Sequence, residues 1–493
     1  MTAAMPGKLA ICMLASEVTP LSKTGGLADV AGALTRYLHG AGHDVRLFTP
    51  AYASIDRRAC ACEPLAGFNS LPLTVGPHHY TFAVRRAALP GGTPVYLIDC
   101  PALYARDALY TAGPDEHLRF LAFTRAALTA VERLDWAPQV LHCNDWHTAF
   151  APLFLRTQWQ SARQFAATRT VLTIHNIGYQ GIFPATQIAD LGLSPAAQSL
   201  LHQDDLAAGH INALRHGILY ADLITTVSPT HAREICSDDY GMGLQDSLRA
   251  RAAAGALHGI LNGVDYAEWD PRRDRYLPAH YDAGSLGVKA ELKREFLVRR
   301  RLAARPGVPL AGLVSRLAVQ KGIELMFEAL PNTLEARPLS FVALGNGEPL
   351  YEDFLTALEQ RFPGRVSFHC GYDEELAHWI EAASDIFLMP SRYEPSGLNQ
   401  MYSLRYGTVP IVRRTGGLAD SVEHYDRASG RGTGIVFNDF DAQGLEWALN
   451  TALDLYAEPA HWQRLVQNGM QRDFSWQHQA RQYVALYAQL IAA

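Results

Sequence analysis

The 493-residue sequence predicts an α/β protein built from two doubly wound, Rossmann-like units. The chain is too long for one hydrophobic core, because most domains hold about 50–200 residues. Short apolar runs alternate with longer amphipathic segments, which is typical of parallel sheets covered by helices on both faces. The same alternation starts again after about residue 257. We therefore expect a second unit of the same class to follow the first.

The first unit is expected to begin with a buried strand over residues 9–14 and a helix over residues 27–39. The apolar part of the stretch 8–16 is too brief for a signal peptide, and helix-ready polar sequence follows at once, which favours the strand. Pro90-Gly-Gly92 marks a hairpin-like turn. The other elements expected in this unit are strands over residues 44–48, 80–86, 95–98, 139–143, 170–174 and 223–227, and a helix over residues 117–134.

The second unit repeats this pattern, and its apolar runs are again short and compact. We expect strands over residues 309–314, 340–344, 366–369, 386–389 and 410–412. Helical segments separate them, at residues 323–334, 349–360, 374–382 and 398–406. An aromatic-rich helical tail runs from about Trp476 to the end. These elements predict a second doubly wound sheet.

Composition excludes several classes of function. The net charge is -6 without any block of like charges, which argues against nucleic acid or an anionic membrane as a partner. No apolar run approaches the roughly 20 residues of a membrane span. The seven cysteines are scattered and odd in number, which favours reduced thiols in the cytoplasm. No Cys or His spacing indicates a metal site.

A hexapeptide occurs twice, as Thr24–Asp29 and as Thr415–Asp420. Each copy follows an apolar strand and precedes a predicted helix, so we expect the two copies to do a similar job at a strand-to-helix turn. Glycine suits the backbone of such a turn, and the helix N-terminus offers free N–H groups to an anion. Helix entry without any ligand is the alternative.

The chain has only five lysines, and two of them lie in glycine-bearing loops, Lys23 before the first hexapeptide and Lys321 before Gly322. A compact ammonium is not interchangeable with a guanidinium, so we interpret both as chosen for their chemistry. Lys23, the glycines and the helix N-terminus suit a phosphate, although no Walker A motif is present. Arg316 follows a predicted strand, and with Lys321 it could neutralise a diphosphate leaving group. A solvated surface pair is the alternative.

Other polar groups follow predicted strands. Glu394 precedes a helix, where a carboxylate is either a first-turn charge or a ligand for sugar hydroxyls. Asp145 and His175 follow two strands of the first unit. A single histidine is more often a core residue than a catalyst, but several polar groups at successive strand ends favour a site. Asn262 lies near the boundary between the units, in a possible turn.

Together these motifs resemble the bacterial glycogen synthases and plant starch synthases over nearly the whole chain. The resemblance is carried by motifs in a fixed order: Lys23-Thr-Gly-Gly-Leu-Ala-Asp-Val30, Asn144-Asp-Trp-His147, Thr173-Ile-His-Asn176, Thr226-Val-Ser-Pro229, Asn262-Gly-Val-Asp265, Val314-Ser-Arg-Leu317, Gln320-Lys-Gly322, Tyr393-Glu-Pro-Ser-Gly397 and Arg413-Arg-Thr-Gly-Gly-Leu-Ala-Asp420. It implies a GT-B fold, with two Rossmann-like domains facing across a deep cleft. It also implies transfer of glucose from ADP-glucose to the non-reducing end of an α-1,4-glucan with retention of anomeric configuration.

The same resemblance implies the domain limits and the site. We expect an N-terminal domain over 1–256, a nucleotide-sugar-binding domain over 257–472 and a C-terminal helix, 473–493, that crosses back to the first domain. The implied catalytic residues are Lys23, His175, Arg316, Lys321 and Glu394. Tyr372 matches a tyrosine that stacks on adenine in relatives. The implied substrate-binding residues are Thr24, Gly25, Gly26, Asp29, Asp145, Trp146, Asn176, Asn262, Tyr372, Ser396, Gly397, Leu398, Asn399, Thr415 and Gly416.

Two other functions compete with this one. A GT-B phosphorylase would need a lysine for pyridoxal phosphate, and few lysines are left for that role; an epimerase of the same fold is its companion alternative. A catalytically silent glycan-binding protein would be expected to lack Lys23, Arg316, Lys321 or Glu394, and all four are present. We therefore expect an enzyme that needs no cofactor and no metal, with ADP-glucose and glycogen as its partners.

Overall fold

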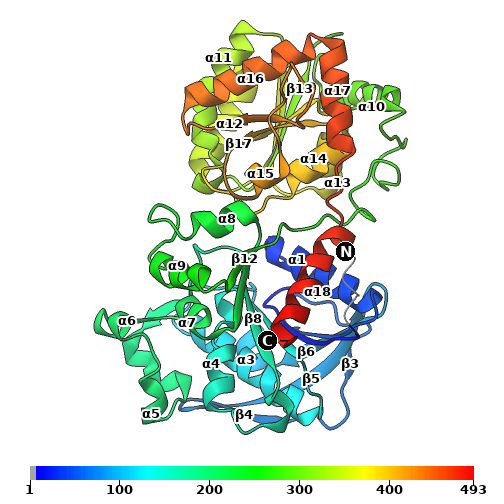
Figure 1. The fold of residues 1–493 in the computed structure, drawn as a ribbon. Coiled ribbons are helices and arrows are strands. Elements are labelled where there is room, and N and C mark those ends of the chain that lie inside the picture. Colours follow the sequence, from blue (N-terminus) through cyan, green and yellow to red (C-terminus); the bar gives the residue numbers. More distant parts are fainter. Residues whose placement is uncertain (1–6, 493) are drawn as a thin grey trace. The chain divides into compact units, whose positions relative to one another are not determined.

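The computed structural model describes residues 7–492, which divide into two compact units. Within these residues the first unit holds 7–227, 232–260 and 476–492, and the second holds 228–231 and 261–475. Figure 1 shows the ribbon in sequence colours, with the final red helix among the elements of the first unit. The end of the chain thus belongs to the unit in which the chain begins.

Parallel strands form the centre of the first unit, in the order β12-β11-β8-β7-β1-β2-β6. Renumbered along the chain, β6-β2-β1-β7-β8-β11 is the order 3-2-1-4-5-6 that characterises doubly wound sheets. Antiparallel β5 extends the β6 edge and pairs with β3 and β4. The bounds are β1 Ala10–Leu14, β2 Asp44–Pro50, β3 Glu63–Pro64, β4 Leu71–Val75, β5 His78–Leu89, β6 Thr93–Asp99, β7 Val140–Asn144, β8 Arg169–Ile174, β11 Leu223–Thr226 and β12 Leu257–Gly259.

Helices connect these strands, and a small excursion interrupts them between residues 182 and 212. In the excursion, β9 (Ile182–Pro184) and β10 (His210–Asn212) form a separate antiparallel pair. The sequence predicted neither this pair nor the short strands β3, β4 and β12. The helices are α1 Gly26–Gly40, α2 Pro101–Tyr104, α3 Glu116–Arg133, α4 Ala151–Thr157, α5 Pro195–Gln198, α6 Gln203–Ala207, α7 Ala213–Tyr220, α8 Pro229–Glu234, α9 Gln245–Ala253 and α18 Trp476–Ala492, with 3₁₀ turns at Trp146–Thr148, Arg163–Phe165 and Ala185–Leu191.

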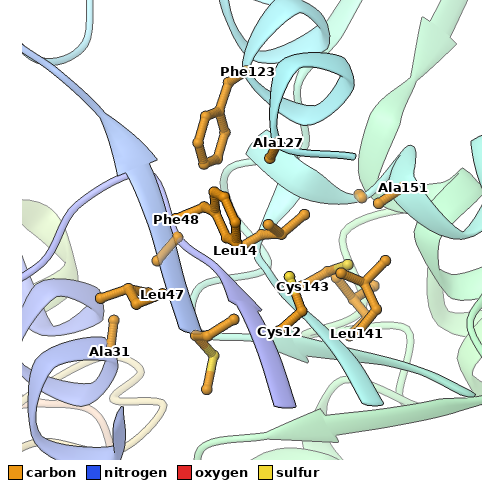
Figure 2. Close-up of a cluster of buried hydrophobic side chains, with 14 of the residues drawn as sticks. Cys12, Leu14, Ala31, Leu47, Phe48, Phe123, Ala127, Leu141, Cys143 and Ala151 are labelled. Atoms are coloured by element: carbon orange, nitrogen blue, oxygen red, sulfur yellow. The ribbon is translucent and has the colours of Figure 1, made fainter. Parts of the chain in front are cut away.

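The central strands of the first unit are buried on both faces, which explains their continuous apolar runs. Consecutive side chains of a strand point to opposite faces, and β2 illustrates this in Figure 2. There Leu47 points toward Ala31 of α1, while Phe48 lies on the side of Phe123 and Ala127 of α3. All of these side chains belong to one buried cluster.

The C-terminal helix α18 is tied to the first unit by a buried polar chain. The Tyr487 hydroxyl lies 2.6 Å from Nδ1 of His142 on β7, and His142 Nε2 lies 2.5 Å from Oγ1 of Thr173 on β8. Burial lowers the pKa of His142 to about 3, so its ring is neutral at neutral pH. A neutral imidazole offers one donor and one acceptor, and both are used here.

The second unit contains an all-parallel sheet in the order β15-β14-β13-β16-β17-β18, again 3-2-1-4-5-6. Its strands are β13 Leu310–Val314, β14 Ser340–Gly345, β15 Val366–Cys370, β16 Ile386–Met389, β17 Val409–Arg413 and β18 Ile435–Phe437. Its helices are α10 Leu286–Arg299, α11 Met326–Ala336, α12 Pro349–Arg361, α13 Glu374–Ala383, α14 Asn399–Tyr406, α15 Gly416–Ser421, α16 Ala442–Tyr456 and α17 Pro459–Met470, with 3₁₀ turns at Val319–Lys321 and Ile323–Leu325.

The α/β class and the second doubly wound unit are therefore as the sequence predicted. Every strand and helix expected from the pattern is present, with ends shifted by a few residues at most. Across residues 7–492, no helix combines the length and the apolarity that a membrane span requires.

We predict that Tyr487→Phe lowers the free energy of unfolding of the first unit by about 1–2 kcal/mol, because it leaves the buried His142 nitrogen without its partner. Urea unfolding followed by fluorescence measures the change. Tyr179→Phe is the control, because Tyr179 is 57% exposed and its variant should stay within about 0.5 kcal/mol of the parent. Equal stability of the Tyr487→Phe variant and the parent would contradict a stabilising role for the contact.

Candidate active site

In the first unit, polar groups gather where β1 ends and α1 begins. Glu17 follows β1 and is buried, and its Oε2 accepts hydrogen bonds from the backbone N (2.5 Å) and Oγ1 (2.8 Å) of Thr24. Burial raises the pKa of Glu17 to about 7. Asp29 in the first turn of α1 binds Nζ of Lys23 at 2.9 Å. The carboxylates thus hold the turn that carries Lys23 in one shape.

The glycines of this first hexapeptide face open space. A Cβ added to Gly26 would meet no atom within 4 Å, and one added to Gly25 would meet only Glu17 Oε1 at 3.9 Å. Helix α1 has no side-chain cap, and the first N–H groups of a helix have no partner within it. The backbone of Gly25 and Gly26 is therefore open to close approach by an anion, whereas the Thr24 N–H is already bound to Glu17.

A second group forms where β7 and β8 end. Asp145 is buried with φ 53°, and its Oδ1 accepts the backbone N of His175 at 2.7 Å and, more distantly, that of Asn176 at 3.5 Å. Burial raises the pKa of Asp145 to about 7. Asn176 in turn accepts the backbone N of Gly178 through its Oδ1, at 3.0 Å. One carboxylate thus fixes the loop that carries His175 and Asn176.

The tautomer of His175 follows from its neighbour Asn144. Asn144 donates Nδ2 to the carbonyl of Leu14 (2.9 Å), so its Oδ1 faces His175 Nε2 (2.9 Å) as an acceptor. The proton therefore lies on Nε2, and Nδ1 carries a lone pair. Burial lowers the pKa of His175 to about 3, so the ring is neutral at neutral pH. His175 can orient a polar group but is not a source of positive charge.

Trp146 differs from its neighbours because its ring is used in packing. It stacks on His147 with the ring centroids 4.2 Å apart and lies edge-on to Phe120 at 5.0 Å. A Cβ on Gly181 would come within 2.2 Å of the indole. The ring is half-buried in this aromatic cluster, and a role in binding substrate stays a prediction.

In the second unit, Lys321 and Glu394 meet. Nζ of Lys321 lies 2.6 Å from Oε2 of Glu394, and the Ser391 hydroxyl donates to the same oxygen at 3.0 Å. Glu394 is 5% exposed, so the ion pair is shielded from water on the carboxylate side. Arg316 follows β13 and is exposed. Asn399 donates Nδ2 to the carbonyl of Val314 at 2.8 Å, joining the start of α14 to the end of β13.

Glycines allow the loops around Glu394 to pack backbone against backbone. A Cβ on Gly416, whose φ is 42°, would lie 2.0 Å from the Glu394 carbonyl, and one on Gly417 would lie 2.1 Å from that of Ser396. A Cβ on Gly322 would lie 2.0 Å from the carbonyl of Pro390. The two hexapeptides both begin helices, as predicted, but their glycines differ in use: the first copy leaves space and the second fills it.

Ser228 and Thr230 hold the same loop from another part of the chain. The Ser228 hydroxyl donates to the carbonyl of Pro395 at 2.7 Å. Thr230 donates its backbone N and its hydroxyl to the two carboxylate oxygens of Asp420, each at 2.7 Å. The Ser228 contact gives the Thr226–Pro229 motif a role in supporting residues 394–397, whereas the Thr230 contacts hold Asp420 of α15.

The remaining predicted residues of the second unit are more dispersed. Tyr372 follows β15 and is 75% exposed. Asn262 is buried, and within the described chain its Oδ1 has no hydrogen-bond partner. Leu398 is the N-cap residue of α14, Thr415 is that of α15, and Gly397 adopts a φ of 68° beside Gln400. The structure therefore brings Lys321, Glu394, Ser396 and Gly416 together. Tyr372 follows β15 and Asn262 precedes α10, so both lie in other loops of the unit.

Glu17 and Asn144 are site residues that the sequence interpretation missed. Glu17 directly follows the first buried strand, and Asn144 ends β7. Position at the carboxyl end of a parallel strand was the available signal in both cases. Among residues 7–492, no cluster of three or more His, Cys, Asp or Glu side chains could hold a metal ion.

Comparison with known proteins agrees with this geometry. The sequence profile of the starch synthase catalytic domain matches residues 10–250, and that of glycosyl transferases group 1 matches residues 296–472. A glycogen synthase of Anaeromyxobacter dehalogenans is 45% identical, covering 97% of this chain and 99% of that protein. A glycogen synthase of Thioalkalivibrio sulfidiphilus is 44% identical, covering 98% of this chain and all of that protein.

A solved structure extends the likeness to the fold. The catalytic domain of starch synthase IV from Arabidopsis thaliana, bound to ADP and acarbose, superposes with a TM-score of 0.90 at 33% identity. The match covers 99% of this chain and all of the plant domain. The predicted GT-B class, with two Rossmann-like domains, is confirmed by this match together with the strand orders.

We predict that Glu17→Gln makes the protein more stable than the parent at pH 8 but not at pH 5. The pKa of Glu17 is raised from its ordinary value of 4.5 to about 7 in the folded state, so the free energy of unfolding falls as pH rises between these values. Glutamine does not ionise and so removes this loss of stability. The free energy of unfolding of the variant should therefore exceed that of the parent by about 1–3 kcal/mol at pH 8.

Urea unfolding at the two pH values measures this difference, with the exposed Glu375→Gln as a control for the loss of one charge. A pH-independent difference between Glu17→Gln and the parent would show that burial does not strain the ionised carboxylate.

Proposed function

The chain belongs to the family of the bacterial glycogen synthases and plant starch synthases, and from this premise we propose that it transfers glucose from ADP-glucose to the non-reducing end of an α-1,4-glucan with retention of configuration. It is a glycosyltransferase. The observation that carries the proposal is the Lys321–Glu394 pair, held by glycine-packed loops at the carboxyl edge of the second sheet with Arg316 at the end of the neighbouring strand.

The donor's diphosphate would bind to the cations of this edge. Arg316 is exposed and Lys321 keeps part of its side chain accessible, so both can contact an incoming anion. Positive charges held in fixed positions stabilise the negative charge that develops on a leaving diphosphate. Tyr372, which follows β15 and is largely exposed, would stack on the adenine. Asn262, Ser396, Gly397, Leu398, Asn399, Thr415 and Gly416 would complete the donor site.

Glu394 would have two roles at once. It binds the Lys321 ammonium now, and its second oxygen leaves capacity to accept hydroxyl groups of the glucose. On the other unit, the Lys23–Gly26 turn would offer backbone N–H groups and an ammonium to the donor, with Asp29 holding Lys23. Neutral His175, with Asp145, Trp146 and Asn176, would orient the transferred sugar and the acceptor.

The proposed reaction needs no carboxylate nucleophile. The bond from the anomeric carbon to the diphosphate oxygen breaks, and the acceptor O4 bonds to that carbon on the same face. The acceptor proton passes to the departing diphosphate oxygen, so the products are ADP and a glucan longer by one residue. The protein orients the two sugars and stabilises the developing charges. Retention follows because departure and attack share one face.

The proposed location of the protein is the cytoplasm. All seven cysteines are unpaired in the structure, as expected of a protein kept in a reducing cytoplasm.

Incorporation of labelled glucose into glycogen, measured side by side with ADP-glucose and UDP-glucose, tests the proposed function. No incorporation from either donor would overturn it.

We predict that Lys321→Ala lowers kcat by about 100–1000-fold, because one charged donor to the leaving group is lost. Incorporation of labelled glucose from ADP-glucose measures the rate. Lys8→Ala removes a surface lysine and is the control. Lys321→Arg keeps the charge but changes its geometry, and it should restore only part of the rate. Near-parental turnover of Lys321→Ala would refute the role.

We predict that Tyr372→Ala raises the KM for ADP-glucose about tenfold, because stacking on a base is worth about 1–3 kcal/mol. The KM for glycogen and the kcat should change little, and Tyr372→Phe should behave as the parent. Trp447→Ala removes another exposed aromatic ring of the second unit as a control. An unchanged KM for ADP-glucose would remove Tyr372 from the donor site.

A further inference from the structure

The second unit has a cationic cavity at the end of its sheet where the strands begin, whereas Lys321 and Glu394 lie where the strands end. It is a half-open hollow of about 280 Å³ at the amino ends of β13, β14 and β15, which are neighbours in the sheet. The proposed donor-binding groups follow the carboxyl ends of the same sheet. A five-residue strand such as β13 separates the two edges by about 15 Å. The cavity is therefore not part of the site described above.

Three arginines line the cavity, and only one of them has a carboxylate partner. Arg337 binds Asp454 at 2.7 Å and Asn450 at 3.3 Å. Arg365 donates Nε and Nη2 to the carbonyls of Leu339 and Arg337, which fixes the guanidinium without neutralising it. The loop residue Arg305 is exposed, and within residues 7–492 its guanidinium makes no hydrogen bond or ion pair.

The only acidic residue among the lining groups does not balance these charges. Glu335 is held in an ion pair by Arg361, which is not a lining residue. Burial and then the Arg305 cation lower the pKa of Arg365, as expected where positive charge is not compensated. This concentration of cations stands out in a chain whose net charge is -6. Two guanidinium groups beside one hollow match the planar, multidentate recognition of phosphate oxygens.

We propose that this cavity binds a phosphate group, either inorganic phosphate or a small phosphomonoester. Arg365, held by the two carbonyls, supplies a fixed guanidinium whose Nη1 remains available within the described chain, and Arg305 closes on the anion from its loop. The volume lies at the lower end of the range for small-molecule sites, which suits a phosphate carrying few further atoms.

The test is calorimetric titration of the full chain with inorganic phosphate in saturating ADP, which occupies the proposed donor site. We expect one phosphate per chain, with the association constant about tenfold lower for Arg305→Ala, the loss of one charge-assisted contact. Arg305→Glu should abolish binding. Arg305 makes no contact that the fold needs, and an unchanged Tm verifies this. Arg294→Ala removes another exposed arginine of the same unit and should bind like the parent.

Three results would overturn the proposal: no phosphate binding to the ADP-saturated parent, equal affinities for Arg305→Ala and Arg294→Ala, or equal heat from a chloride titration. Titration with glycerol 3-phosphate distinguishes the two sources of phosphate. Binding more than tenfold tighter than that of inorganic phosphate identifies a phosphomonoester as the ligand, and similar or weaker binding identifies inorganic phosphate. A chloride titration at matched ionic strength must give no comparable heat, since equal heat would reduce the effect to general screening.

Discussion

The strand order 3-2-1-4 in each sheet is the constraint on which the site depends. From β1 and β7, and again from β13 and β16, the connections leave the sheet in opposite directions, so no connection covers the carboxyl ends of these neighbouring strands. The residues that follow there are the polar ones: Glu17 and Asp145 in one unit, and Arg316 and Glu394 in the other. In the first unit, burial raises the pKa of Glu17 and that of Asp145 to about 7.

The sequence was sufficient to predict the fold because its signals were redundant. Apolar runs, glycine turns and amphipathic segments agreed in both halves, so the central strands of both sheets and several of their helices could be placed, whereas the helices α10, α16 and α17 were not predicted. The predictions failed where a segment carried no periodic pattern, as in the β9–β10 excursion. Element ends also shifted, as at α14, where Leu398 is the N-cap residue and the helix begins at Asn399.

Site residues were predictable as types but not as partners. Lys321 and Glu394 were each expected to contact the donor, yet their bond to one another depends on loops that lie 73 positions apart in sequence. The two hexapeptides are identical in sequence, but the glycines of the second pack against the carbonyls of Glu394 and Ser396, whereas those of the first face open space. Glu17 was missed because one carboxylate after a strand has no distinctive spacing. Its burial and its two hydrogen bonds from Thr24 arise only in the tertiary structure.

The first unit depends on helix α18, which lies far from its other elements in the sequence. Residues 476–492 complete the first unit, although some 200 residues of the second unit precede them. A fragment ending near residue 260 would expose the surface that Tyr483 and Tyr487 normally cover and would leave Nδ1 of His142 without its partner. The first 260 residues therefore lack one helix of the unit to which they belong. During synthesis on the ribosome, the first unit acquires α18 only after the second unit has been made.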